Sequence, residues 1–253
     1  MRAYTAFVKK EFREMARTYK LLIMGVVFFI IGVLNPVTAK FLPELLKSLV
    51  QDGIQITITE PVAMDSWMQF YKNVPQMGLI VLVIVFSGIL SNEISKGTLV
   101  NVLTKGLSRK NVILAKFTSV GLIWTISYFF CFAISYLYTR FFWEEIVPNL
   151  FFSVFCLWFF GLMLVSIVIL GGVLFKSNYG ALLVTAIAVG ALLLVNIIPP
   201  LQEYNPMMLS SDNVALLRQE REVADFILPL IVSGVLMLAS LITSIAVFNK
   251  KKL

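Results

Sequence analysis

The residues best placed to do chemistry in this sequence are charged ones in the stretch 92–116, which lies between two long apolar runs. Glu93, Lys96, Arg109 and Lys116 are spread through that stretch. At the centre of a bilayer each charge would cost about 3 kcal/mol, while each Leu, Ile or Val returns only about 0.5 kcal/mol. The stretch is therefore expected to stay in water, where its charges can hydrogen-bond the stretch itself or a partner.

No group in the sequence is arranged for catalysis. The chain has no His, which removes the commonest general base and metal ligand. Cys131 and Cys156 lie in apolar runs without metal-ligand spacing, and the carboxylates at 144–145, Glu220 and Glu222 are typical of solvated surface. The sequence also lacks the Gly-x-x-x-x-Gly-Lys-[Ser/Thr] loop that holds nucleotide phosphates. We therefore expect no catalytic residue, no metal site and no cofactor in this chain.

The stretch 92–116 contains its own helix boundaries. Gly97 and Thr98 predict a helix start, because a Thr oxygen can accept from the free N–H groups of a first turn. Gly106 predicts a stop, because a left-handed residue commonly closes a helix. We expect a short helix from Leu99 to Lys105 between them. Ser108 then predicts the cap of a second helix that continues into the next apolar run.

The same stretch resembles the cytosolic loop between the second and third membrane helices of ABC-2-type transporter permeases. The shared pattern is Glu-x-x-x-Gly-Thr-Leu, a further Leu, Ser-Arg, and a Lys that leads into the third helix. The residues that carry it here, and that the resemblance assigns to coupling, are Glu93, Gly97, Thr98, Leu99, Leu103, Gly106, Ser108, Arg109 and Lys116. Gly106 stands where the family commonly has Pro, and either residue ends a helix. The resemblance implies that this loop docks in a separate ATP-hydrolysing subunit, which would hold the ATP and Mg²⁺.

The rest of the chain is built to cross a membrane. At 253 residues and 59% hydrophobic, it is too apolar for a soluble domain. A crossing helix needs about 20 apolar residues. Runs near that length occur at 21–39, 75–91, 117–139, 150–175, 180–198 and 227–248. We expect one all-α membrane domain over 1–253, with six transmembrane helices.

Charge predicts the orientation of these spans. With both termini in the cytoplasm, the inner segments hold 15 of the 21 Lys and Arg residues, and such residues resist translocation. We therefore expect a multi-pass protein of the plasma membrane with both termini and the stretch 92–116 in the cytoplasm. Residues 1–20 predict a basic amphipathic helix in the membrane interface. The alternative for this end is a signal peptide with 21–34 as its apolar region and 37–39 as its cleavage site.

Two further features concern the outer half. Trp67, Phe70 and Tyr71 are expected in the first outer loop, where they would suit an aromatic belt at the interface. Asn35 and Asn196 are costly to bury and lie near the outer ends of the first and fifth spans. They are candidates for a translocation path, and packing between helices is the alternative for each.

Together these features favour the permease subunit of an ATP-driven exporter that moves amphipathic or antimicrobial peptides, or related amphiphiles. The alternatives are an exporter of glycan-linked or other lipids, and a membrane anchor that recruits an ATPase without moving cargo. The expected partners are two ABC ATPase subunits, a second copy of this chain or a close relative, and anionic lipids. Nucleic acid is not among them.

Overall fold

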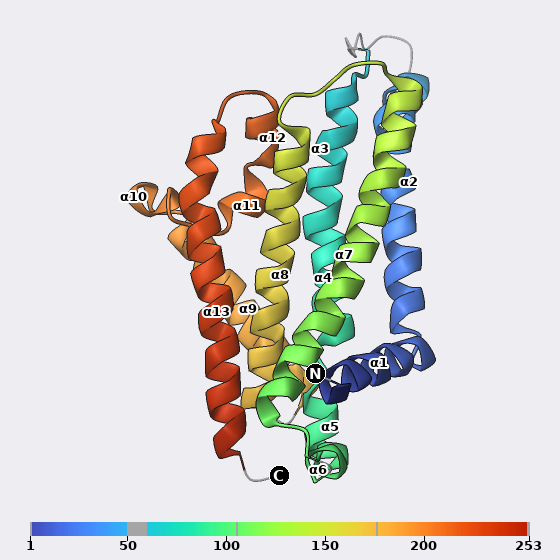
Figure 1. Cartoon of the computed structure of the whole chain (residues 1–253). Coiled ribbons are helices and arrows are strands. Elements are labelled where there is room, and N and C mark those ends of the chain that lie inside the picture. The colour runs from blue at the N-terminus through green and yellow to red at the C-terminus, as the bar shows by residue number, and fades with distance from the viewer. Residues whose placement is uncertain (1, 50–59, 105, 176, 252–253) are drawn as a thin grey trace.

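The computed structural model describes residues 2–49, 60–104, 106–175 and 177–251. In this part of the chain every regular element is helical (Figure 1). The elements are α1 (Arg2–Arg17), α2 (Lys20–Leu49), α3 (Ala63–Asn73), the π-helical turn η1 (Val74–Gly78), α4 (Leu79–Phe86), α5 (Ser91–Ser95), α6 (Thr98–Leu103), α7 (Arg109–Phe142), α8 (Leu150–Leu174), α9 (Asn178–Val195), α10 (Pro199–Gln202), α11 (Met208–Ser211), α12 (Asn213–Leu217), the 3-10 turn η2 (Val223–Phe226) and α13 (Ile227–Lys250).

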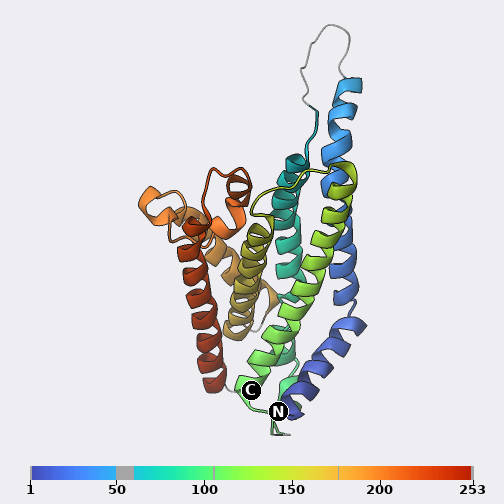
Figure 2. The same ribbon diagram turned by 45° about the horizontal axis from the view of Figure 1, so that its top comes forward.

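The six expected membrane helices are present. The segments long and apolar enough to cross a bilayer are Lys20–Glu44, Ala63–Ser95, Arg109–Phe142, Leu150–Leu174, Asn178–Val195 and Val223–Lys250. They stand side by side, with α1 lying across one end of the bundle (Figures 1 and 2). The same end carries α5, α6 and the last turn of α13 (Figure 1). The protein is therefore a multi-pass membrane protein of the all-α class.

The second span is longer than the sequence predicts, and the expectation of an aromatic belt at 67–71 is wrong. Helix α3 runs into α4 through η1, where Pro75 lacks the N–H that a regular turn needs. Trp67, Phe70 and Tyr71 on α3 are buried in the core. Tyr71 shares a hydrogen bond of 2.5 Å with the Ser153 hydroxyl of α8. These rings pack between helices because α3 extends the second span toward the end opposite α1 (Figure 1).

Helix α8 is the centre of the bundle. In its most apolar window 72% of residues are buried, the largest share among the six spans. Gly161 lets α7 approach closely, because a Cβ at this position would lie 2.4 Å from the Trp124 ring. The indole of Trp124 donates to the Trp158 carbonyl at 2.9 Å. Small residues commonly allow this kind of contact between membrane helices.

Helices α9 and α13 are the least covered spans. Only 17% of the corresponding window of α9 and 22% of that of α13 are buried. Between them, α10, α11 and α12 form a return segment in the outer half of the bundle, where α11 and α12 pack mainly against α8 (Figure 1). This return places polar residues of the segment 199–217 alongside an apolar span.

Candidate coupling site

A short helix lies between two left-handed glycines, as the sequence predicts. Gly97 has φ of 67° and Gly106 has φ of 88°, and α6 lies between them as Thr98–Leu103, ending short of Lys105. Thr98 does not have the expected role. Its hydroxyl donates to the Glu93 carbonyl at 3.4 Å, so it contacts the end of α5 instead of serving as the predicted cap.

Ser108 caps the next helix, as predicted. Its hydroxyl accepts from the Asn111 N–H at 3.3 Å, which satisfies one of the free donors of a first helical turn. Helix α7 then runs without interruption from Arg109 into the third span. The loop and the third span are therefore joined by one continuous helix.

The leucines of α6 face the protein. Leu99 is 1% exposed, and Leu103 is half-buried and packs against the core. Exposed positions occur at Lys96 and Thr104 on either side of the helix. Leu99 therefore anchors α6, and a docking surface would be formed by the groups that remain outside.

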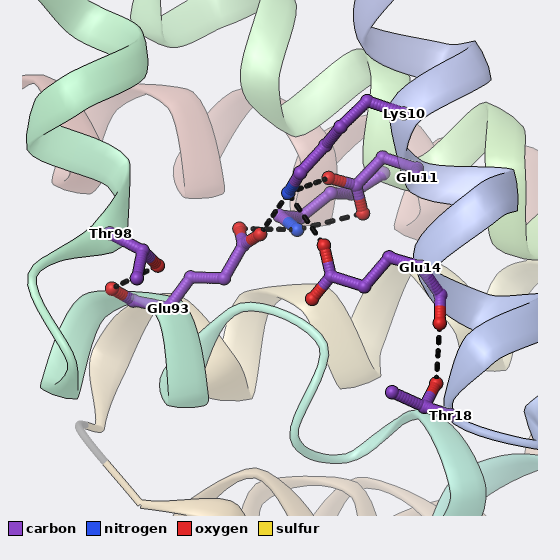
Figure 3. Close-up of polar contacts among 7 residues, drawn as sticks. Lys10, Glu11, Glu14, Thr18, Glu93 and Thr98 are labelled. Atoms are coloured by element: carbon purple, nitrogen blue, oxygen red, sulfur yellow. Dashed lines mark hydrogen bonds and ion pairs between the residues drawn. The ribbon is translucent and has the colours of Figure 1, made fainter.

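Glu93 and Lys116 belong to a cluster of ions where α1, α5 and α7 meet. The Lys116 ammonium lies 2.6 Å from a Glu93 carboxylate oxygen and 3.0 Å from one of Glu11. The Lys10 ammonium lies 2.6 Å from Glu93, 2.7 Å from Glu14 and 3.2 Å from Glu11. Figure 3 shows Glu93 reaching from α5 toward the α1 side chains. This ion cluster holds the base of the second span, the start of the third span and α1 together.

Because the ion cluster is largely buried, its charged members depend on one another. Lys116 is 0% exposed, Glu11 2% and Glu93 7%, and a buried ion without its counterion costs several kcal/mol. Burial alone would lower the pKa of Lys10, but its hydrogen bonds to Glu14 and Glu93 outweigh burial and raise that pKa. Oxygens of Glu11, Glu14 and Glu93 approach within 4.8 Å of one another. The two ammonium groups supply the positive charge that those carboxylates require.

Sequence reasoning missed Glu11. The helical spacing of the sequence predicts an apolar side of the first helix made of Tyr4, Val8, Phe12, Met15 and Tyr19. In the structure the buried line is Phe7, Glu11 and Met15, and Tyr19 is 68% exposed. The spacing of four residues places an acid in the middle of an apolar helix face, which could have identified Glu11 as needing a buried partner.

Arg109 holds the end of the sixth span. Its guanidinium donates to the carbonyls of Phe248 at 2.5 Å, Asn249 at 3.1 Å and Lys251 at 2.7 Å. It also lies over the Phe248 ring, 5.6 Å from the centroid. The last carbonyls of a helix have no partner within the helix and carry partial negative charge. Arg109 therefore serves as the C-terminal cap of α13 and joins it to the coupling loop.

The two asparagines occupy different environments. Asn35 is fully buried; its amide donates to Ser135 at 3.1 Å and its oxygen accepts from Asn73 at 2.9 Å. It is satisfied by contacts among α2, α3 and α7. Asn196 accepts from Asn205 at 3.2 Å and lines a cavity at the outer end of α9. A role of Asn196 in a translocation path therefore stays a prediction, and the residue does line a cavity. The contacts of Asn35 are those of helix packing.

We predict that Gly97→Ala will loosen α6. An added Cβ at this position meets no atom within 4 Å, so the cost is backbone strain alone, about 1 kcal/mol. Hydrogen exchange of the α6 amides should rise about fivefold. The matched variant Gly97→Asn should change it less, because Asn tolerates a left-handed conformation. Equal effects of Ala and Asn would show that the positive φ is not what matters.

Comparison with known proteins agrees with this architecture. A protein of Bacillus subtilis (strain 168), described as the uncharacterized transmembrane protein YxlG, is 21% identical over 147 residues. The aligned region covers 57% of this chain and 57% of that relative, so the match spans just over half the length of each. The sequence model of the family described as ABC-2 family transporter protein matches residues 5–253. The chain therefore belongs to the ABC-2 family of transporter proteins.

Proposed function

We propose that this chain is the membrane-spanning permease subunit of an ATP-driven exporter. A separate ABC ATPase, with ATP and Mg²⁺ bound, would dock on α6 at the cytoplasmic end of the bundle. The observation that supports this most is the way α6 is mounted. It is a short helix between two glycines, with Leu99 anchored beneath it and connections to three membrane spans.

The connections from α6 suggest how a displacement of this helix by the ATPase would be transmitted to the membrane spans. Toward the third span, movement passes directly from Ser108 into α7. Toward the sixth span, it passes through the bonds of Arg109 to the end of α13. It reaches α1 through the ion pairs of Glu93 with Lys10 and of Lys116 with Glu11. Helix α1 packs against α7, where Tyr4 shares a hydrogen bond of 2.7 Å with Thr118. The contacts of α1 with α7 favour transmission to the third span over transmission to the first span.

For the cargo we propose an amphipathic molecule, with an antimicrobial or toxic peptide as the leading class. A largely uncharged bundle suits such a molecule better than a hydrophilic ion. In the part of the chain that the structure describes, ion pairs lie at the α1 end and in the outer segment 212–221. A glycan-linked lipid is the second class. The two classes are separated by which of them stimulates ATP hydrolysis in the reconstituted complex.

Six spans form half of an exporter of this kind, so we propose two copies, or one copy and a close relative, above two ATPase subunits. The poorly covered faces of α9 and α13 support such pairing. The termini and α6 would lie in the cytoplasm of a plasma-membrane protein. If the chain were only an anchor, the ATPase would bind, but no cargo would change its rate of ATP hydrolysis.

We predict that Thr104→Trp will disrupt the complex with the ATPase. Thr104 is exposed beside α6, so added bulk should obstruct docking without disturbing the core. The amount of ABC ATPase that co-purifies with the tagged permease should fall about tenfold, which corresponds to about 1.4 kcal/mol. Ile146→Trp is the matched control, because Ile146 is 87% exposed in the opposite loop. Unchanged co-purification with Thr104→Trp would contradict docking at α6.

A further inference from the structure

A polar cavity of about 550 Å³ lies where the return segment meets the outer ends of α9 and α13. Its polar lining comes from Asn196, Gln202, Glu203, Asp212, Arg221 and Asp225. Three carboxylates and one guanidinium thus line the cavity, and Arg221 lies 3.9 Å from Asp212. Among the residues that the structure describes, Glu203 and Asp225 are not paired with Lys or Arg. The cavity therefore carries an excess of negative charge.

The position of this cavity makes the excess charge significant. The cavity wall also includes Ala224 and Leu228 at the outer end of the sixth span, so the carboxylates lie against the start of an apolar helix. Carboxylates at the level of an apolar span are costly and usually have a positive partner or a function. Among the described residues that line the cavity, one guanidinium accompanies three carboxylates.

An apolar groove of about 330 Å³ lies along α9, farther from its outer end than the cavity. It runs between α4 and α9, and its wall includes Pro75, Ile80, Ile84, Leu182, Ala186 and Val189. The α9 positions 182, 186 and 189 and the cavity residue Asn196 are spaced by four, three and seven residues, which places them on one helix face. Val189 and Asn196 are about 10 Å apart along the axis. Met207 lines the groove and the next residue, Met208, lines the cavity.

We propose that the cavity and the groove together form one binding site for a basic amphipathic peptide. An apolar side chain of the peptide would occupy the groove, and a Lys, Arg or N-terminal ammonium group would lie among Glu203, Asp212 and Asp225. The assignment rests on the proposed function, which it narrows to positively charged cargo. The groove alone gives little preference, because a bilayer is as apolar as its wall. Charge complementarity in the cavity supplies the selectivity.

Binding can be measured on the full-length permease without any ATPase. The chain is placed in phosphatidylcholine nanodiscs and titrated with a labelled peptide that has Leu along one side and Lys along the other. The matched peptide has Glu in place of each Lys, and empty nanodiscs correct for partition into lipid. We expect saturable binding of the Lys peptide, weakened by added salt, and no saturable binding of the Glu peptide.

Variants locate the site on the protein. Glu203→Gln should weaken binding of the Lys peptide about threefold, as expected for one partly exposed charge. Ala186→Phe should weaken it by filling the groove. Glu144→Gln, an exposed acid in another outer loop, should leave it unchanged. All three positions are exposed, and size-exclusion profiles should confirm that the variants fold.

Equal saturable binding of the two peptides would overturn the assignment. So would binding that neither Glu203→Gln nor Ala186→Phe alters. Because no ATPase is present, these results do not depend on whether α6 couples to one. Loss of ATPase docking with intact, variant-sensitive peptide binding would instead count against the exporter mechanism alone.

Discussion

Replacing Lys116 with Met should destabilise the protein by about 3 kcal/mol or more, because Glu11 and Glu93 would remain buried with too little positive charge. Lys116 starts the third span and pairs with Glu93 at the base of the second span and with Glu11 on α1. The unfolding temperature in detergent should fall by several degrees. ATP hydrolysis by the assembled complex should also lose its response to cargo, since α7 would lose its ion pairs to α1 and α5.

A second substitution tests the cause. In Lys116→Met combined with Glu93→Gln, one negative charge has been removed with the positive one, and much of the lost stability should return. Lys110→Met is the surface control, because Lys110 is exposed in the same helix, and it should change stability by less than about 0.5 kcal/mol. An equal loss in Lys116→Met and the double variant would mean that packing of the lysine stem, and not its charge, stabilises this junction.

Replacing Arg109 with Gln should release the end of the sixth span. Three carbonyls of residues 248–251 lose their donor, at a cost of about 1–2 kcal/mol because water can reach part of this site. Hydrogen exchange in the last turn of α13 should rise about tenfold. Arg109→Lys should restore only part of the protection, because an ammonium group does not reproduce the fork of a guanidinium. No change in exchange with Gln would contradict the capping role.

The same variant separates a structural cap from a coupling contact. In the assembled transporter, Arg109→Gln should leave basal ATP hydrolysis in place and reduce its stimulation by cargo. If Arg109 instead contacted the ATPase directly, the amount of co-purified ATPase would fall as well. The hydrogen bonds to α13 favour the first outcome.

The features that were predictable from the sequence are those set by local physics. Apolar runs revealed the six spans, and Gly97, Gly106 and Ser108 located the helix boundaries of the loop because each acts on its own backbone or the next turn. Span lengths were underestimated where a helix continued past a proline, as at Pro43 and in the turn containing Pro75.

The contacts between distant segments were not predictable. Nothing near Arg109 indicates that its donors reach carbonyls about 140 positions away, and Glu11 finds Lys116 only after α1 folds across α7. Leu99 illustrates the same limit, because an apolar residue on a short helix suits a partner groove and the protein's own core equally well. In the structure Leu99 is buried in the protein's own core.

The most direct test of the coupling role is accessibility of the groups beside α6. Single-cysteine substitutions Lys96→Cys and Thr104→Cys can be labelled with a membrane-impermeant maleimide, because the native Cys131 and Cys156 are buried. We expect labelling only from the cytoplasmic side, and protection of both positions when the ABC ATPase is bound. Labelling from the outer side, or full labelling of both positions within an active complex, would contradict docking of the ATPase on α6.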